Sequence, residues 1–244
     1  MLISSIDNQK IKDIKKLETK KIRDLEGLYL VEGEHLVYEA YQNKLLQTLI
    51  VKDGYPVKLD VDTIYVTDKV LKYLSSLTTP SPMIGVVKKR DNLKIGHKVL
   101  VLDSIQDPGN LGTIIRSAVA FNFDTIILSD DTVDLYNSKV IRATQGMIFK
   151  INIIVANLSN ILTDLKNNNY SIYGTDVNNG KSVKSIAKIK KFAIIMGNEG
   201  QGLSNKTKTL CDDFIYIPVT SNCESLNVAV AASIIMYELC GFEG

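Results

Sequence analysis

The 244-residue sequence contains no tryptophan and only three cysteines, Cys211, Cys223 and Cys240. The cysteines lack the short paired spacing of metal sites, and neither His35 nor His97 lies near them in the sequence. Neither a zinc site nor a disulfide framework is therefore expected. Cysteines used in this way are typical of a reducing compartment, so we expect a cytoplasmic protein without a metal.

Long apolar runs are also missing. No stretch reaches the roughly 20 residues that span a membrane, and the opening residues, MLISSIDNQKIKD, lack the apolar core of a signal peptide. The composition, 45% apolar and 23% charged, is that of an ordinary globular protein. We expect a soluble protein with no membrane partner, large enough for one large or two modest domains.

The common glycine-rich nucleotide motifs are absent. The sequence has no GxGxxG after an early strand and no GxxxxGK[ST], which argues against a dinucleotide-binding fold and a P-loop. It also has no internal repeat and no low-complexity segment. Any nucleotide-like ligand must therefore be held in another way.

Short β-like runs alternate with helical segments along the whole chain, which predicts an α/β protein. In the first part these runs are LYLVEG, TLIVKD, TIYVT and MIGVVKK, and RDNLKIGH (90–97) is the best linker candidate. From Lys98 onward the runs are richer in Val and Ile and almost continuously apolar, as in parallel strands covered on both faces. We predict a small α/β domain over 1–95 and a mostly parallel α/β domain over 96–244.

The positive charge is concentrated near the N-terminus. Residues 1–98 hold 17 Lys and Arg against 13 Asp and Glu, whereas residues 99–244 hold 12 against 14. The excess lies in KIKDIKKLETKKIR, where apolar residues recur at helical spacing. This helix is either a solvated surface or a face that binds RNA phosphates. The candidate RNA-binding residues are Lys15, Lys16, Lys20, Lys21 and Arg23.

Three predicted strands in the second domain end in polar residues. Ligands gather at the carboxyl ends of parallel strands, so these residues form a candidate site. The first exit, DSIQDPGNLGTIIRSAVAFN, carries Asn110 and Arg116, the second, FAIIMGNEGQGLS, carries Glu199, and the third, IYIPVTSNCESLN, carries Ser225 and Asn227.

Each of these residues also has a purely structural explanation. Asn110 is suited to cap a helix, and the charge of Glu199 suits a helix N-terminus. Arg116 could extend from an apolar helix to water. Capping by Asn222 or Ser225 accounts for part of the polar stretch before the last helix but leaves Asn227 unexplained, because we expect Asn227 to lie inside the first turn. Its amide is then either buried and paired or directed toward a ligand.

The three exits together resemble a known family. NLGTIIRSAVAF, IIMGNEGQGLS and IPVTSNCESLNVAVAASI look like the three ordered motifs of the SpoU, or TrmH, branch of the SPOUT RNA methyltransferases. LETKKIRDLEGLYLVEGEHLVYEA is similar to the RNA-substrate-binding domain often fused ahead of that catalytic domain. One departure is Asn122, which stands where the family usually has glycine after the first helix.

The resemblance implies an architecture that periodicity cannot indicate. Members of this family thread the C-terminal segment through a loop to form a trefoil knot, and they bind S-adenosylmethionine there, mainly through backbone groups. Carried over to this chain, the cofactor-binding positions are Gly197, Ile217, Leu226 and Thr175. The family is dimeric through this domain, so a homodimer is implied.

The resemblance also implies the reaction, transfer of a methyl group from S-adenosylmethionine to a ribose 2′-hydroxyl of structured RNA. The implied catalytic residues are Asn110, Arg116, Glu199, Ser225 and Asn227. Arg116 is the family's favoured proton acceptor, but a guanidinium stays protonated, so gripping the adjacent phosphate is an equally good role. Ribosomal RNA is the expected substrate. The alternatives are transfer RNA as the substrate and a noncatalytic RNA-binding protein on the same fold.

Overall fold

The computed structural model describes residues 2–91, 94–177, 179–186 and 189–240. The chain forms two compact units, unit 1 with Met1–Asn92 and Asp134–Phe149, and unit 2 with Leu93–Val133 and Lys150–Gly244. Residues 134–149, which the sequence places in the second domain, thus pack within unit 1. The division after residue 95 into an RNA-binding domain and a catalytic domain remains a prediction.

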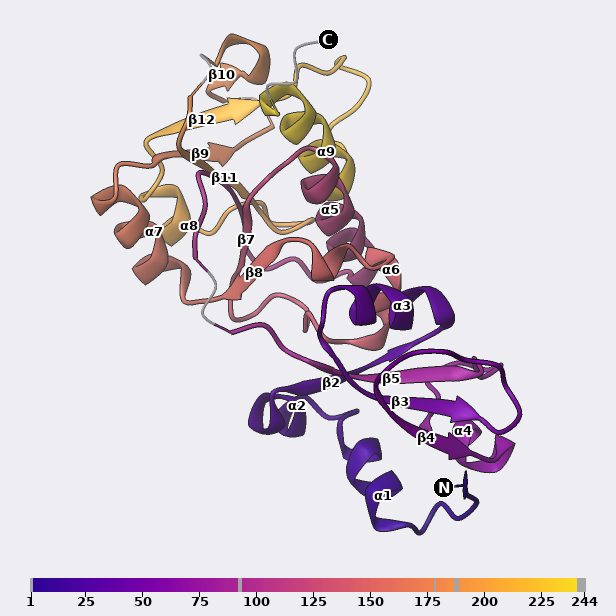
Figure 1. Ribbon diagram of the computed structural model, residues 1–244. Helices are drawn as coiled ribbons and strands as arrows, with labels where there is room; N and C mark the ends of the chain where they lie inside the picture. The colour runs from indigo at the N-terminus through magenta and orange to yellow at the C-terminus, as the bar shows by residue number, and fades with distance from the viewer. Residues whose placement is uncertain (1, 92–93, 178, 187–188, 241–244) are drawn as a thin grey trace. The chain divides into compact units, whose positions relative to one another are not determined.

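Unit 1 contains a mixed five-stranded sheet in the order β1-β4-β3-β5-β2 (Figure 1). β5 runs antiparallel to β2 and β3, whereas β4 runs parallel to β1 and β3. The strands are β1 (Leu2–Ile3), β2 (Leu28–Glu32), β3 (Leu46–Lys52), β4 (Asp62–Val66) and β5 (Met83–Lys88). The helices are α1 (Gln9–Lys16), α2 (Lys20–Glu26), α3 (Glu34–Gln42), α4 (Asp68–Leu74) and α6 (Ser138–Thr144), followed by the 3-10 turn η1 (Met147–Phe149).

The basic N-terminal segment forms two short helices, so the prediction of a single helix is wrong. α1 ends at Lys16 with Leu17 as its C-cap, and the extended backbone of Thr19 (φ −92°, ψ 134°) precedes α2. The break allows the apolar stripe of Ile11, Ile14 and Leu17 to pack into the core of unit 1. Periodicity alone does not reveal such a break, because both helices continue the same pattern of lysines and apolar residues.

Unit 2 is built on a seven-stranded, entirely parallel sheet in the order β10-β12-β9-β11-β6-β7-β8. This confirms the prediction of a mostly parallel α/β fold. The strands are β6 (Lys98–Leu102), β7 (Thr125–Leu128), β8 (Asn152–Val155), β9 (Ser171–Thr175), β10 (Lys181–Ser182), β11 (Phe192–Met196) and β12 (Asp213–Tyr216).

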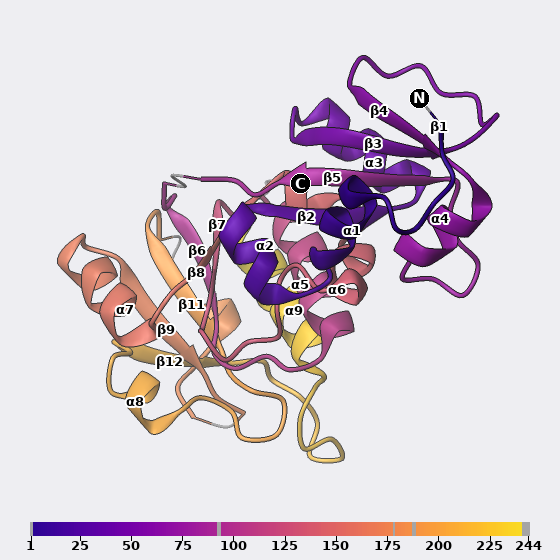
Figure 2. The ribbon, with the colours of Figure 1, turned by 90° about the horizontal axis from the view of Figure 1, so that it is seen from below.

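Helices cover both faces of the unit 2 sheet (Figures 1 and 2). α7 (Leu158–Asn167) and α8 (Asn205–Lys208) lie on one side, with the short η2 (Val183–Ser185) near the sheet edge, and α5 (Pro108–Ala120) packs with α9 (Val228–Leu239) on the other. Burial on both sides explains why the strands are almost continuously apolar. Asn122, after α5, adopts φ 54°, a left-handed conformation that asparagine tolerates in place of glycine.

Among the described residues, no helix combines the length and apolar character needed to cross a membrane.

Candidate active site

A pocket of about 490 Å³ opens in unit 2 beyond the carboxyl ends of β9, β11 and β12. This is where parallel sheets usually bind ligands, and the volume is typical of a site for a small molecule. All four residues proposed to bind the cofactor, Thr175, Gly197, Ile217 and Leu226, line it. The structure therefore brings together positions that are up to 51 residues apart in the chain.

The glycine-rich loop after β11 closes on itself. Asn198 and Gly202 exchange two backbone hydrogen bonds of 3.0 Å, and the Asn198 Oδ1 accepts the Gly200 N–H at 2.9 Å. A Cβ on Gly197 would lie 2.3 Å from the Gly202 carbonyl carbon and 2.4 Å from the Leu203 nitrogen. Gly197 is thus required by the tight turn itself, and not only by a close approach of a ligand.

A chain of side-chain hydrogen bonds joins the three predicted motifs at the edge of this pocket. The Asn227 Nδ2 donates to the Asn110 Oδ1 at 3.0 Å, and the Asn110 Nδ2 donates to the Glu199 Oε1 at 3.1 Å. The Glu199 carboxylate also accepts the backbone N–H groups of Gln106 and Asp107, each at 3.4 Å. The two amides are therefore held in one orientation by a carboxylate at the end of the chain.

The helix caps differ from those expected. Asn227, not Asn222 or Ser225, caps α9, because its Oδ1 accepts N–H groups of the first turn. Asp107, not Asn110, caps α5, since its Oδ1 accepts the Asn110 N–H at 2.7 Å. The sequence signal for this cap is an aspartate directly before a proline that begins a helix. With capping done by Asp107, the Asn110 side chain is available to the site.

The environment of Glu199 favours its charged form. Partial burial tends to raise the pKa of Glu199, but hydrogen bonds from Asn110 and from the backbone N–H groups of Glu199, Asp107 and Gln106 outweigh it and lower the pKa below 4.5. Glu199 is consequently an anion at neutral pH. It is suited to orient Asn110 rather than to accept a proton.

Ser225 and Arg116 take different places. Ser225 lines the pocket and is exposed. Arg116 lies on the exposed face of α5, outside the residues that line the pocket, and forms no ion pair with Glu199 or another described residue. Within one chain, hydrogen bonds thus join Asn110, Glu199 and Asn227, and of the five predicted catalytic residues Glu199 and Ser225 line the pocket. Arg116 belongs to neither group.

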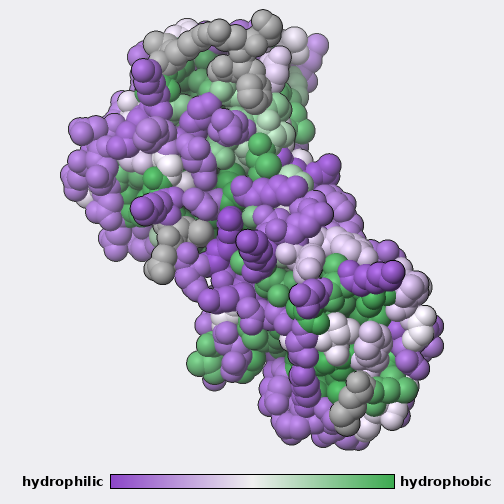
Figure 3. All heavy atoms as spheres, in the orientation of Figure 1, coloured by the Kyte–Doolittle hydropathy of each residue, from purple (hydrophilic) through white to green (hydrophobic). Residues whose placement is uncertain are grey.

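The helix that carries Arg116, α5, packs beside α9, and α9 has exposed apolar side chains. The two helices are joined by a 2.7 Å hydrogen bond between the hydroxyls of Ser117 and Ser233. Beside them, Val230 is 48% and Tyr237 62% exposed, and Figure 3 shows apolar colour over this part of unit 2. A helix as apolar as α9 is usually covered on most sides, so this face is suited to a protein partner.

The charge of the pocket suits a cationic ligand. Its acidic side chains are Asp176, Glu199 and Glu224, whereas Lys208 is its basic one. S-adenosylmethionine carries a positive sulfonium, and the pocket adds apolar walls from residues such as Ile217 for an adenine ring. The residues present therefore fit this cofactor. No cluster of three or more metal-binding side chains occurs in the described part of the chain.

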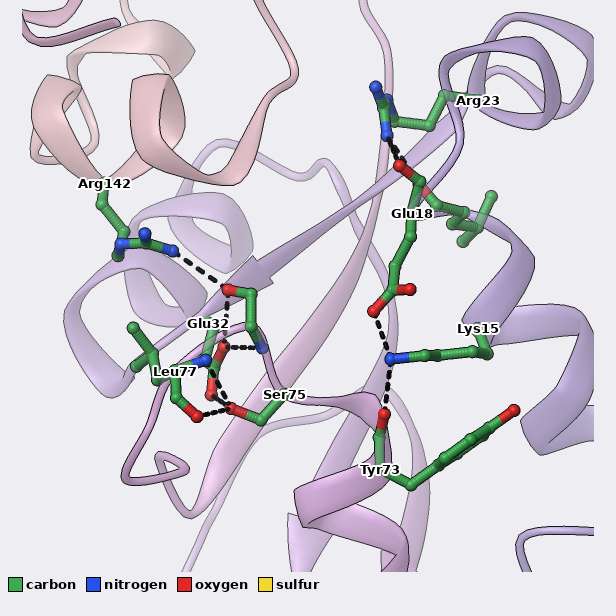
Figure 4. Close-up of polar contacts among 10 residues, drawn as sticks. Lys15, Glu18, Arg23, Glu32, Tyr73, Ser75, Leu77 and Arg142 are labelled. Atoms are coloured by element: carbon green, nitrogen blue, oxygen red, sulfur yellow. Dashed lines mark hydrogen bonds and ion pairs between the residues drawn. The ribbon is translucent and has the colours of Figure 1, made fainter.

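The predicted RNA-binding lysines lie on α1 and α2 and are mostly paired with acidic neighbours. Lys16 contacts Asp13 and Lys20 contacts Asp24, each at 2.7 Å. Lys15 pairs with Glu18 and donates to the Tyr73 carbonyl at 2.6 Å (Figure 4). Lys21 is exposed and has no ion pair within the described residues. These pairs reduce the positive field that the sequence suggests.

Arg23 is 6% exposed and serves the structure of unit 1. Its guanidinium donates to the carbonyls of Leu17 and Glu18, at 2.9 and 2.6 Å, and pairs with Asp134. These bonds connect α2 to the end of α1 and to the segment before α6. Because Arg23 is buried and its guanidinium already binds these three partners, we do not retain it as an RNA-binding residue.

Models of two protein families match the chain. The model of the SpoU rRNA methylase family matches residues 97–237, and that of the MRM3-like substrate binding domain matches residues 8–85.

The chain is also similar to known proteins over nearly its whole length. It is 38% identical to the 23S rRNA (guanosine(2553)-2'-O)-methyltransferase RlmP of Bacillus subtilis (strain 168), covering 98% of this chain and 99% of that protein. A crystal structure of an AdoMet-bound rRNA methyltransferase from Sinorhizobium meliloti superposes with a TM-score of 0.86 at 28% identity, covering 98% and 97% of the two chains. An RNA 2'-O ribose methyltransferase structure gives a TM-score of 0.80 at 27% identity, covering 98% of each chain.

Proposed function

The chain belongs to the SpoU rRNA methylase family, and we propose that it uses the unit 2 pocket to methylate a ribose 2′-hydroxyl of ribosomal RNA. It is an S-adenosylmethionine-dependent RNA 2′-O-methyltransferase. The observation that carries the proposed site is the hydrogen-bond chain from Asn227 through Asn110 to Glu199 beside that pocket.

The cofactor is held by the pocket walls in this proposal. Gly197, Ile217, Leu226 and Thr175 surround it, and the acidic side chains favour its positive charge. When bound, S-adenosylmethionine supplies a methyl group activated by the sulfonium. Because Asn198 Nδ2 also donates to the Ser104 carbonyl at 2.8 Å, the glycine-rich loop is anchored before any ligand arrives. Such preorganisation lowers the cost of binding.

The amides of Asn110 and Asn227 orient the ribose. Each Nδ2 carries two hydrogens, and one of each pair is used in the chain toward Glu199. The second hydrogen of each is available to a ribose or phosphate oxygen. Ser225 adds a hydroxyl at the pocket. Donors fixed in this way favour the developing negative charge on the attacking oxygen.

A homodimer through unit 2 would bring Arg116 to a reaction site. Arg116 is outside its own chain's pocket but lies on the exposed α5 and α9 face that suits a partner. A second copy on this face would cover Val230 and Tyr237 and place Arg116 at the subunit boundary. There its guanidinium can bind the phosphate beside the target ribose or take part in proton transfer. We also propose that the C-terminal segment forms the trefoil knot that the family resemblance implies.

Ribosomal RNA is favoured over transfer RNA because RlmP, similar over the full length of the chain, acts on 23S rRNA by its name. Unit 1 supplies the RNA-binding surface, with Lys15, Lys16, Lys20 and Lys21 on α1 and α2. Such a substrate and the free cysteines favour a cytoplasmic location.

Cofactor binding separates this proposal from a noncatalytic RNA-binding protein. We expect S-adenosylmethionine to raise the melting temperature of the protein in proportion to the logarithm of its concentration above Kd. Gly197→Ala, whose added Cβ would overlap the backbone of Gly202 and Leu203 and force the loop to shift, should reduce the rise in melting temperature. Absence of any shift at millimolar cofactor in the wild type would favour the noncatalytic alternative.

A further inference from the structure

A second pocket, of about 260 Å³, is lined entirely by residues of unit 1. Its floor is apolar, with Leu30 from β2, Ile84 from β5, Leu74 from α4 and Ile141 from α6. Its polar rim comes mainly from the segment that leads into α6. This volume is just below the range of about 300–1,000 Å³ that is usual for ligand pockets, so the pocket has room for one small group such as a single base and not for a base pair.

The carboxylate of Glu32, which lines this pocket, already accepts hydrogen bonds from the protein. The Glu32 Oε1 accepts from the Ser75 hydroxyl at 2.5 Å and the Ser81 N–H at 3.3 Å. The Glu32 Oε2 accepts from the N–H and the hydroxyl of Ser76, at 3.0 and 3.1 Å. Glu32 therefore holds the loop after α4 and needs no ligand. The guanidinium of Arg23, also in the lining, is engaged with Leu17, Glu18 and Asp134.

Glu18, the other carboxylate in the lining, is paired with Lys15, and the polar groups that remain include several donors. Arg142 makes one side-chain hydrogen bond within the described residues, from Nη1 to the Ser76 hydroxyl at 3.0 Å, and Figure 4 shows it approaching the Glu32 network from α6. A guanidinium has five N–H donors, so most of those on Arg142 are unused. The Asn137 Nδ2 and the Ser138 hydroxyl, both in the lining, donate to no described residue. The pocket thus combines an apolar floor with surplus donors.

A nucleotide has an apolar face for the floor of this pocket and acceptors for its unused donors. Its flat base fits an apolar floor, and its phosphate and base carbonyls accept hydrogen bonds. Tyr136, half-buried in the lining, adds an aromatic ring. The centroid of this ring lies 4.5 Å from that of Tyr29. RNA-binding proteins commonly read single-stranded loops by taking one unstacked base into such a site.

We propose that the unit 1 pocket binds one unstacked nucleotide of the RNA substrate, with Arg142 contacting its phosphate or base carbonyl. This inference rests on the proposed function, because it assigns the nucleotide to the RNA that unit 2 methylates. The pocket then contributes to the choice of RNA, while the unit 2 site performs the reaction. Arg142, Asn137 and Ser138 are the specificity residues.

The test compares Arg142→Ala with Lys139→Ala, which removes an exposed cation from the same helix but outside the pocket lining. The probe is an unmodified transcript of 23S rRNA. A hydrogen bond to a charged group is typically worth a factor of about ten or more in affinity. Arg142→Ala should therefore raise the KM for the transcript about tenfold or more, with kcat and the Kd for S-adenosylmethionine unchanged. Equal KM values for the two variants would overturn the pocket assignment.

A second variant protects the test against loss of folding. Ser138→Phe keeps Arg142 but fills the pocket, and it should raise the KM for the transcript as Arg142→Ala does. In the wild type, a transcript containing 4-thiouridine or 6-thioguanosine should crosslink to the peptide that spans Tyr136 to Arg142. Crosslinks confined to other parts of the chain would refute the proposal.

Two other outcomes identify which claim fails. Binding of free nucleoside monophosphates as tight as binding of the transcript would assign the pocket to a soluble nucleotide and overturn the RNA assignment. Wild-type protein that binds no S-adenosylmethionine and methylates no transcript would instead refute the proposed function. The pocket alone fails if the wild type methylates the transcript and Arg142→Ala behaves as Lys139→Ala does.

Discussion

The polar groups of the two units are used in opposite ways. In unit 2, Asn227, Asn110 and Glu199 form a directed chain of hydrogen bonds, which ends at a carboxylate that lines a pocket and leaves one hydrogen of each amide unused. On α1 and α2 of unit 1, most lysines are paired with a neighbouring carboxylate, as Lys16 is with Asp13. The first arrangement is fixed before the substrate binds, whereas the second has to exchange its ion pairs for phosphates.

This difference predicts unequal consequences of mutation. Exposed ion pairs contribute little to stability and are screened by salt, so their loss should change RNA binding gradually. A fixed donor near developing charge acts in the transition state, and its loss should change the rate steeply.

Replacement of Arg116 should have the largest effect. We expect Arg116→Ala to lower kcat by about 10²–10³ while the Kd for S-adenosylmethionine stays unchanged, because Arg116 does not line the pocket. Thr113→Ala, on the same exposed face of α5, is the matched control. Single-turnover methylation measures the rate. Rescue by Arg116→Lys would favour simple charge stabilisation, and failure of Lys would favour a bidentate grip. Wild-type turnover of Arg116→Ala would remove it from the site.

Two substitutions of Asn227 can separate its role as a helix cap from its proposed role in catalysis. Asn227→Asp keeps the oxygen that caps α9 but loses the Nδ2 donor to Asn110. We expect a melting temperature close to that of the wild type and a loss of about 10² in kcat. Asn227→Ala should also lose about 1 kcal/mol of stability with the cap. Thermal unfolding and methylation kinetics on the same samples decide this. Full activity of the Asp variant would reduce Asn227 to a structural cap.

Gly197→Ala tests the preformed loop. The added Cβ would meet the Gly202 and Leu203 backbone at 2.3–2.4 Å, so the loop has to shift. Overpacking of this kind costs roughly 1–3 kcal/mol, and we expect the affinity for S-adenosylmethionine to fall about tenfold or more. Gly200→Ala is the control, since the nearest atom to its Cβ would be 3.7 Å away. Titration calorimetry measures both affinities. Equal affinities would show that the loop is not rigid.

The lysines of unit 1 should give the smallest effect. Joint replacement of Lys15, Lys16, Lys20 and Lys21 by Ala should weaken RNA binding and flatten its dependence on salt concentration. The change should be less than four independent phosphate contacts would give, because three of the lysines are already paired. Filter binding at several salt concentrations provides the slope. An unchanged slope would leave α1 and α2 as a solvated surface.

The parts of this protein that the sequence predicted are those set by local pattern. Continuous apolar runs identified the parallel strands of unit 2, and the polar strand ends identified Asn110, Glu199 and Asn227 before their contacts were known. The caps were missed because Asp107 and Asn110, or Ser225 and Asn227, are equally good capping residues in isolation. Which of them caps depends on where the helix begins.

Long-range packing was the part that local pattern could not predict. Arg23 looks like one more exposed cation in KIKDIKKLETKKIR, yet its partner Asp134 is 111 residues away. The same applies to α6, which packs with unit 1 although the chain reaches it from β7 of unit 2. The seven residues of α6 carry too weak a periodic signal to be found by pattern.

The position of the transferred methyl group tests the central claim most directly. Wild-type protein would be incubated with methyl-labelled S-adenosylmethionine and unmodified 23S rRNA, and the RNA would then be hydrolysed with alkali. A 2′-O-methyl group blocks cleavage at the adjacent phosphodiester, so the account predicts that the label is recovered in an alkali-resistant dinucleotide. Recovery of the label in mononucleotides methylated on the base would contradict it.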